Sequence, residues 1–208
     1  MITQLKRLTG RLGILLVCIS GNAMADDAGT LKTRLSSLES FQAGFSQQVI
    51  DEQGETVHQA SGTIMMARPN QLRWETQQPD ETVLIADGES VWHIDYWVEQ
   101  VTVMSQQQAV ENNPMVLLTS NDEKVWQQYS IEQLDDKTFK VSALADSGQI
   151  KALTLAFADG GLASLVMLDS QGQQSVIEFS QRQFNQTISS DTFRANVPEG
   201  FMVDDQRS

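Results

Sequence analysis

The sequence of 208 residues predicts a mainly β protein with helices (α+β), built on a single curved antiparallel sheet. Between Ala60 and Ser105, five short β-type runs are separated by turn residues, a spacing typical of an antiparallel meander. Two of these runs, 62–67 (GTIMMA) and 82–86 (TVLIA), are apolar on both faces, so each face must be covered. About ten or eleven strands are expected in all, which is too many for a flat sheet. We therefore predict a strongly curved half-barrel whose concave side is filled by helices.

Residues 1–25 have the features of a secretory signal peptide. Lys6, Arg7 and Arg11 form a positive region, an apolar stretch follows, and Ala23-Met24-Ala25 forms a cleavage site. The apolar stretch is far shorter than the roughly 20 residues of a membrane span, which disfavours the alternative of a retained signal anchor. We predict cleavage after Ala25, which leaves residues 26–208 as one exported domain.

The cysteine and charge content of the predicted mature chain excludes several functions. The only cysteine, Cys18, lies inside the predicted signal peptide, and the bulky Val17 before it argues against lipidation. Disulfides, thiol chemistry and thiolate metal sites are therefore not expected. Removal of three leader cations leaves 11 Lys/Arg against 27 Asp/Glu, a formal charge of −16. Without a basic stripe, we expect no nucleic-acid binding and repulsion from anionic membranes, whereas apolar ligands and basic partners remain open.

The N-terminal part of this domain is expected to be a helix followed by a hairpin. From Thr30 to about Gln42, apolar residues recur at helical spacing and form one stripe, for which core packing is favoured over a ligand wall. The stripe consists of Leu31, Leu35, Leu38, Phe41 and, at its end, Phe45. A strand over 41–50 then leads through a turn at 51–54 to a returning strand over 56–67.

A short apolar helix interrupts the strands after residue 106. Asn112-Asn113-Pro114 is a helix-start signal, with Asn113 as N-cap and Pro114 at the first helical position. The helix that follows, Met115-Val116-Leu117-Leu118, is apolar all round. A helix without a polar face cannot lie on a surface in water, so we expect a plug or a lid.

The second half of the chain returns to strands. They are expected over 126–134, 138–144, 150–157, 163–169 and 174–184, with turns at 135–136, 146–148, 159–161 and 170–172. A partly apolar tail, 191–208, ends the chain, and no linker divides the domain.

Nothing in the sequence points to catalysis. His58 and His93 are the only histidines, and His93 alternates with Trp92 and Ile94 in a strand, as a packed or rim histidine would. Motifs for a nucleophile elbow, a zinc protease or a phosphate loop are absent. Most carboxylates lie at turns, and the Asp204-Asp205 pair is interpreted as a solvated tail in preference to a cation site. We expect no enzyme activity, no cofactor and no metal.

Strand alternation places an arginine beside apolar side chains. Ile64, Met66 and Arg68 share one face of their strand, so the guanidinium faces a large desolvation penalty. It can reach water, pair with a carboxylate, or donate to the carbonyls of a helix end. We hypothesise that Arg68 latches the helix of residues 115–118 over a cavity, with a rim arginine in a surface salt bridge as the alternative. The candidate lining of this cavity is Ile64, Met66, Leu72, Trp74, Leu84, Trp92 and Met104.

The mature chain resembles the periplasmic outer-membrane lipoprotein carrier protein (LolA) family along its whole length. The resemblance is most specific in Arg68-Pro69 and in Leu72-Arg73-Trp74-Glu75. It extends to Pro79, Asp87-Gly88, Val91-Trp92, Glu99-Gln100-Val101, the 31–45 helix, Asn113-Pro114-Met115 and the ending at Pro198 and 203–207. The chain departs from the family at Leu72, where an aromatic is common, and at Ile94-Asp95-Tyr96, where Tyr-x-Pro is frequent.

The resemblance implies an incomplete β-barrel, closed by helices, with an apolar cavity for lipoprotein acyl chains. It places the family's lid arginine on Arg68. It further implies a periplasmic chaperone that takes lipid-modified lipoproteins from an inner-membrane ABC complex and delivers them to an outer-membrane receptor lipoprotein. We expect a monomer. The alternatives are a periplasmic interaction or assembly module without a lipid ligand and, more remotely, a lipid-modifying hydrolase.

Overall fold

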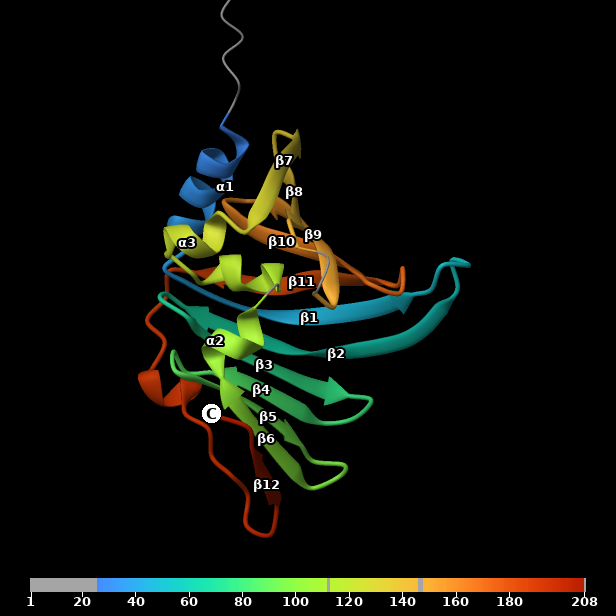
Figure 1. The fold of residues 1–208 in the computed structure, drawn as a ribbon, viewed down its shortest axis with the longest axis vertical. Coiled ribbons are helices and arrows are strands. Elements are labelled where there is room, and N and C mark those ends of the chain that lie inside the picture. The colour runs from blue at the N-terminus through green and yellow to red at the C-terminus, as the bar shows by residue number, and fades with distance from the viewer. Residues whose placement is uncertain (1–25, 112, 146–147, 208) are drawn as a thin grey trace, which may run out of the picture.

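The computed structural model describes residues 26–207 except 112 and 146–147 (Figure 1). The predicted signal peptide with Cys18 and its cleavage site therefore lies outside the described residues, as do Asn112 and part of the predicted 146–148 turn. The helical elements are α1 (Asp27–Ser36), α2 (Gln106–Val110), η1 (Pro114–Leu118), α3 (Glu123–Trp126) and η2 (Ser190–Phe193). The strands are β1 (Ser40–Ile50), β2 (Thr56–Ala67), β3 (Gln71–Gln78), β4 (Thr82–Ala86), β5 (Ser90–Asp95), β6 (Gln100–Ser105), β7 (Tyr129–Asp135), β8 (Thr138–Ala143), β9 (Ile150–Ala158), β10 (Gly161–Asp169), β11 (Gln174–Phe184) and β12 (Met202–Asp205).

All described strands belong to one 12-stranded sheet. Its order is β12-β6-β5-β4-β3-β2-β1-β11-β10-β9-β8-β7. Strands β2 to β6 form the predicted antiparallel meander, and the sheet curves strongly with α2 and α3 across one face (Figure 1). The prediction of a single curved sheet is confirmed. One pair differs from the predicted antiparallel pattern, because β12 of the C-terminal tail runs parallel to β6.

The register of the meander separates two sets of side chains. Ile64 is opposite Trp74, and Met66 is opposite Leu72. Because side chains alternate along each strand, these residues share one face. That face belongs to the main core, where Ile64 and Met66 pack with Leu117 and Leu118 of η1.

The opposite face of strands β4 to β6 carries a second apolar cluster. Its buried members are Val83, Ile85, Ile94, Val101 and Val103, and it is closed by Trp92, Ala195 and Phe201. Ala195 and Phe201 come from the C-terminal segment, residues 194–207. One face of the doubly apolar strand β4 is therefore covered as predicted, and Leu84 and Ala86 on its other face line a cavity.

The predicted helix over residues 30–42 is wrong in its second half. The helix α1 begins after Asp26, whose carboxylate accepts from the Gly29 amide at 2.9 Å, and it ends at Ser36. Leu31 and Leu35 form its buried face. Phe41 and Phe45 lie instead in β1, where they and Ala43 are buried at every second position. Pairing of β1 with both β2 and β11 stabilises the strand in this stretch.

Three short helical elements were not predicted: α2, α3 and η2. The helix α2 begins directly after β6, with the Ser105 hydroxyl accepting from the Gln108 amide at 3.4 Å. The helix α3 is capped by Asp122, whose carboxylate accepts a hydrogen bond from the Lys124 backbone amide at 2.9 Å. Trp126, predicted to start a strand, is the last residue of α3, and β7 begins only at Tyr129. In the described part of the chain, no helix is both long enough and apolar enough to cross a bilayer.

Candidate apolar binding site

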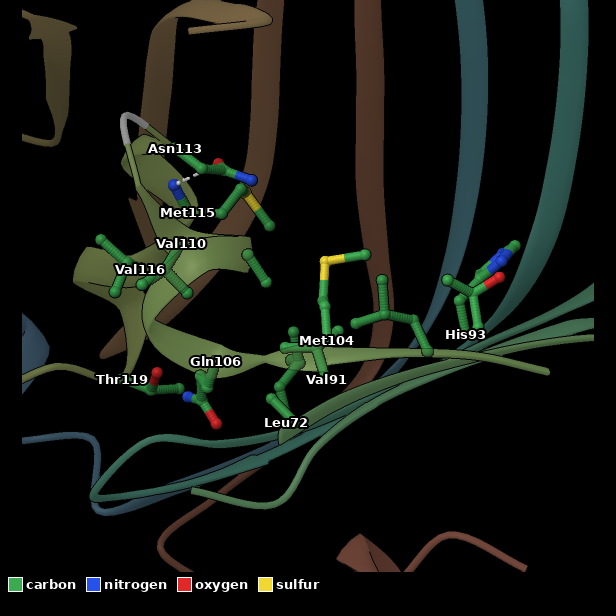
Figure 2. Close-up of a pocket in the computed structure, with 14 residues that line it drawn as sticks. Leu72, Val91, His93, Met104, Gln106, Val110, Asn113, Met115, Val116 and Thr119 are labelled. Atoms are coloured by element: carbon green, nitrogen blue, oxygen red, sulfur yellow. Dashed lines mark hydrogen bonds between the residues drawn. The ribbon is translucent and has the colours of Figure 1, made fainter. Parts of the chain in front are cut away.

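A cavity of about 340 Å³ lies between the sheet and the segment that follows β6 (Figure 2). Strands β3 to β6 supply one wall, because their register aligns side chains from all four strands on one face. This wall consists of Leu72, Leu84, Ala86, Val91, His93, Thr102 and Met104. The facing wall consists of Gln106, Ala109, Val110, Asn113, Met115, Val116 and Thr119. A mostly apolar concave site of this size, with few polar groups, is typical of a small-molecule or lipid pocket.

The facing wall belongs to residues 106–121, which we call the lid. Within it, the Asn113 side chain accepts from the Met115 amide at 3.0 Å and Pro114 occupies the first turn of η1, so the local signal operates as predicted. Met115 and Val116 line the cavity. Leu117 and Leu118 point away from it into the main core and are 0% and 1% exposed. The helix is apolar all round because one side faces the cavity and the other faces the core.

Arg68 connects the sheet to the end of the lid. Its Nη2 lies 2.8 Å from the Leu118 carbonyl and 3.4 Å from that of Leu117. Its Nη1 lies 3.2 Å from the Ser120 carbonyl and 2.7 Å from Asn121 Oδ1. These acceptors include carbonyls that a helix end leaves without intrahelical partners. The latch hypothesis predicts that the guanidinium donates to carbonyls at the end of the lid helix, and Arg68 is placed to do so.

The surroundings of Arg68 are those of a cation removed from water. Burial lowers the pKa of its guanidinium, although arginine remains charged at any physiological pH. The buried Nε has no hydrogen-bond partner among the described residues. Among the described residues, Arg68 forms no ion pair. The alternative of a surface salt bridge therefore does not describe its position in this structure.

The predicted lining residues divide into three groups. Leu72, Leu84 and Met104 line the cavity directly. Ile64, Met66 and Trp74 lie on the same sheet face but pack in the main core. The third group is Trp92 alone, which does not line the cavity and lies on the opposite face.

The placement of Trp92 follows from its register. It pairs with Ile85 and Val103, both members of the second cluster. Its indole donates to the Asp87 carboxylate at 2.9 Å, and the Arg207 guanidinium lies 5.2 Å from its ring. Burial alone would raise the pKa of Asp87, but hydrogen bonds from the backbone amides of Ser90 and Glu89 and from the Trp92 indole together lower it.

Several lining residues were missed by sequence reasoning. Val91 and His93 precede and follow Trp92 in β5. They pair with Ala86 and Leu84 of β4, and all four residues line the cavity. Gln106 and Val110 lie on α2, which has no apolar periodicity to reveal it. Two departures from the family pattern have different settings: Leu72 lines the cavity, whereas Tyr96 lies at the β5–β6 turn with its ring 5.5 Å from that of Phe201.

The fold and this site define a class of protein: an open, strongly curved sheet with an apolar cavity beneath a hydrogen-bonded helical lid. The chain belongs to the outer membrane lipoprotein carrier protein LolA family, whose profile matches residues 36–196. An outer-membrane lipoprotein carrier protein of Pseudoalteromonas translucida is 35% identical over 97% of this chain and 98% of its own length.

Another relative agrees with this assignment, and a solved structure has a similar fold. A protein of the same name from Vibrio cholerae is 37% identical over 93% of this chain and 97% of its own length. An uncharacterised conserved protein from Thermus thermophilus has a similar fold, with a TM-score of 0.50 at 12% identity over 85% of this chain and 99% of its own. The latter similarity concerns the fold alone.

Proposed function

We propose that this protein is a periplasmic chaperone that binds the acyl chains of lipoproteins in the cavity beneath the lid. It receives them from the inner-membrane ABC lipoprotein-releasing complex and delivers them to an outer-membrane receptor lipoprotein. The observation that supports this most strongly is the apolar cavity under a lid whose end is held by the Arg68 guanidinium. The names of the full-length relatives agree with the same cargo.

The size of the cavity indicates that cargo displaces the lid. Its volume of about 340 Å³ is near the lower end of the roughly 300–1,000 Å³ common for ligand pockets. We interpret the structure as the closed form of the carrier. When cargo enters, the lid moves away and the apolar residues beneath it, among them Ile64 and Met66, become part of the binding surface.

A carrier must also release what it binds. Buried methylene groups contribute about 0.8 kcal/mol each, so one fully buried long acyl chain gives on the order of 12 kcal/mol. Opening the lid breaks the Arg68 hydrogen bonds and removes Leu117 and Leu118 from the core. These costs subtract from the affinity and leave a closing reaction that competes with cargo. Methionines such as Met104 and Met115 adapt the walls to chains of different shape.

The proposal includes two further features: the protein does not catalyse a reaction, and its signal peptide is removed. The site residues act by binding and release, without catalysis. The mature protein starts at Asp26, which mass measurement of the periplasmic protein tests directly. Recovery with Met1 intact, or with lipid on Cys18, would contradict an exported carrier.

The binding function is tested by uptake of an environment-sensitive apolar dye and its competition by a diacylated peptide. We expect Leu84→Asp, on the cavity floor, to abolish uptake. Val57→Asp is the matched control, because Val57 is also in a strand but is 53% exposed. If the wild-type protein takes up no dye, or if the acylated peptide does not compete, the interaction module without a lipid ligand becomes the better account.

A further inference from the structure

Both ends of the lid meet at the same turn of the sheet. At the far end, the Thr119 carbonyl accepts from the Asn70 amide at 3.3 Å, next to the carbonyls held by Arg68. At the near end, Gln106 Nε2 donates to the Asn70 carbonyl at 2.9 Å. Asn70 belongs to the β2–β3 turn and has a φ of 61°, a left-handed conformation that asparagine tolerates better than most residues. One peptide group on each side of Asn70 thus contacts a different end of the lid.

Both polar atoms of the Gln106 side-chain amide, and its backbone N–H, form hydrogen bonds. Its Oε1 accepts from the Gly88 amide at 2.9 Å, and its N–H donates to the Glu89 carbonyl at 2.8 Å. The side chain therefore joins the first residue of α2 to the β2–β3 and the β4–β5 turns. It is only 9% exposed, and a buried polar group of this kind is expensive to disrupt because its partners lose their bonds as well.

The two ends of the lid are fastened differently. The far end is held mainly by a side chain, Arg68, on the carbonyls that end η1. The near end continues directly from β6 and is fixed on two turns by Gln106. Each end makes one backbone hydrogen bond to a turn, but the near end continues directly from the paired strand β6, so we expect local opening to begin at the Arg68 end.

We propose that Gln106 is a positioning residue that anchors the hinge of the lid. It keeps the start of α2 in place while the end at residues 117–121 swings away, and it returns that end to register with Arg68 on closing. This inference rests on the proposed carrier function. Glutamine fits the role because it is donor and acceptor at once, whereas glutamate cannot donate to the Asn70 carbonyl and leucine can do neither.

Two backbone amides report on the two ends, and hydrogen exchange of the ligand-free mature protein reads both. The Asn70 amide reports the far end through Thr119, and the Gly88 amide reports the near end through Gln106. In Arg68→Leu we expect exchange at Asn70 to rise about tenfold while Gly88 is unchanged. In Gln106→Leu we expect exchange to rise at both amides, although Arg68 is intact. Gln106→Glu should behave similarly at Asn70.

A control variant and a milder variant of Gln106 complete the hydrogen-exchange experiment. Gln42→Leu removes a glutamine hydrogen bond of 2.8 Å to Gln183 Oε1, away from the lid, and should leave both amides unchanged. If Gln106→Leu fails to fold, Gln106→Asn keeps the donor and acceptor on a shorter side chain. We expect Gln106→Asn to give intermediate exchange at Asn70, because the shorter side chain cannot span both turns.

Dye retention separates an anchoring role from a merely structural one. If Gln106 acts by presenting the lid to Arg68, the double variant Arg68→Leu/Gln106→Leu should retain dye as long as either single variant does. Additive effects in the double variant, or unchanged exchange at Asn70 in Gln106→Leu, would overturn the proposal. Exchange is measured without ligand, so a protein that shows the expected exchange but binds no acyl chain contradicts only the carrier function.

Discussion

Strands β4 to β6 are covered on both faces, and the two covers are built differently. On the cavity face the lid leaves a partly open cavity of about 340 Å³ and is held at its end by hydrogen bonds from Arg68. On the opposite face, residues 194–207, which we call the C-terminal segment, pack Ala195 and Phe201 directly on the second cluster. The face beneath the lid includes the polar side chains of His93 and Thr102, whereas the buried residues of the second cluster are all aliphatic. The two covers also differ in how each is fastened.

The C-terminal segment is integrated into the sheet. Its strand β12 pairs with β6 over four residues, and beyond it Arg207 contacts the Trp92 ring and the Asp205 carboxylate. The hydrogen bonds from Arg207 lower the pKa of Asp205 to about 2, with the side-chain bond first among them. Backbone pairing and apolar packing make this cover part of the fold. The lid contributes no strand to the sheet, so the proposed opening would leave the strand pairing intact.

The largest expected effect is that of a charge on the core-facing side of the lid helix η1. Leu117→Asp should lower the free energy of unfolding by about 4 kcal/mol and also weaken dye binding, because Leu117 is fully buried and its replacement must be buried unpaired or hold the lid open. Thermal unfolding and dye titration measure the two effects. Val98→Asp, at a position 58% exposed, should change neither. Wild-type values for Leu117→Asp would mean that residues 115–118 do not close the cavity.

A smaller effect, on stability alone, is expected from the other cover. Phe201→Ala should cost about 2 kcal/mol of unfolding free energy, since the ring is partly buried against the second cluster, and it should leave dye affinity unchanged. Met202→Ala, at a residue 65% exposed, is the neighbouring control. Loss of dye binding in Phe201→Ala would show that the two faces are coupled and would break the comparison.

The mildest change replaces the latch by another cation. Arg68→Lys keeps the charge but loses the planar fork that reaches several acceptors at once, so it should weaken lid closure by about 1–2 kcal/mol. Transfer of a labelled lipoprotein to the receptor should slow by about 5- to 30-fold, with unchanged stability of the sheet. A lysine variant as defective as Arg68→Leu would indicate that hydrogen-bond geometry, and not charge, decides latching.

The sequence predicts those parts of the fold where local pattern and tertiary pairing agree. The β2–β6 meander and the start of η1 at Asn113-Pro114 are of this kind. The end of α1 is not, because Phe41 and Phe45 are four residues apart, a spacing that fits a helix turn and a strand face equally well. Only pairing of β1 with two neighbours decides between them.

The candidate site shows the same limit. The apolar bulk of Trp92 suggested a cavity wall, yet register places the cavity-facing residues one position away, at Val91 and His93. Gln106 lies in a polar stretch that looks like a loop, and its burial depends on turns distant in the sequence. Arg68 was found because an arginine on an apolar strand face demands hydrogen-bond partners wherever the chain provides them.

The measurement that tests the central claim most directly is lipoprotein transfer by Arg68→Leu, with loading and delivery measured separately. Removal of the guanidinium loses hydrogen bonds from a charged donor, worth about 1.5–3 kcal/mol each, so closing no longer competes with cargo. The variant should accept a labelled lipoprotein from the inner membrane at the wild-type level and fail to pass it to the receptor. Lost loading, with normal delivery of whatever is loaded, would contradict the latch and place Arg68 at the contact with the donor complex.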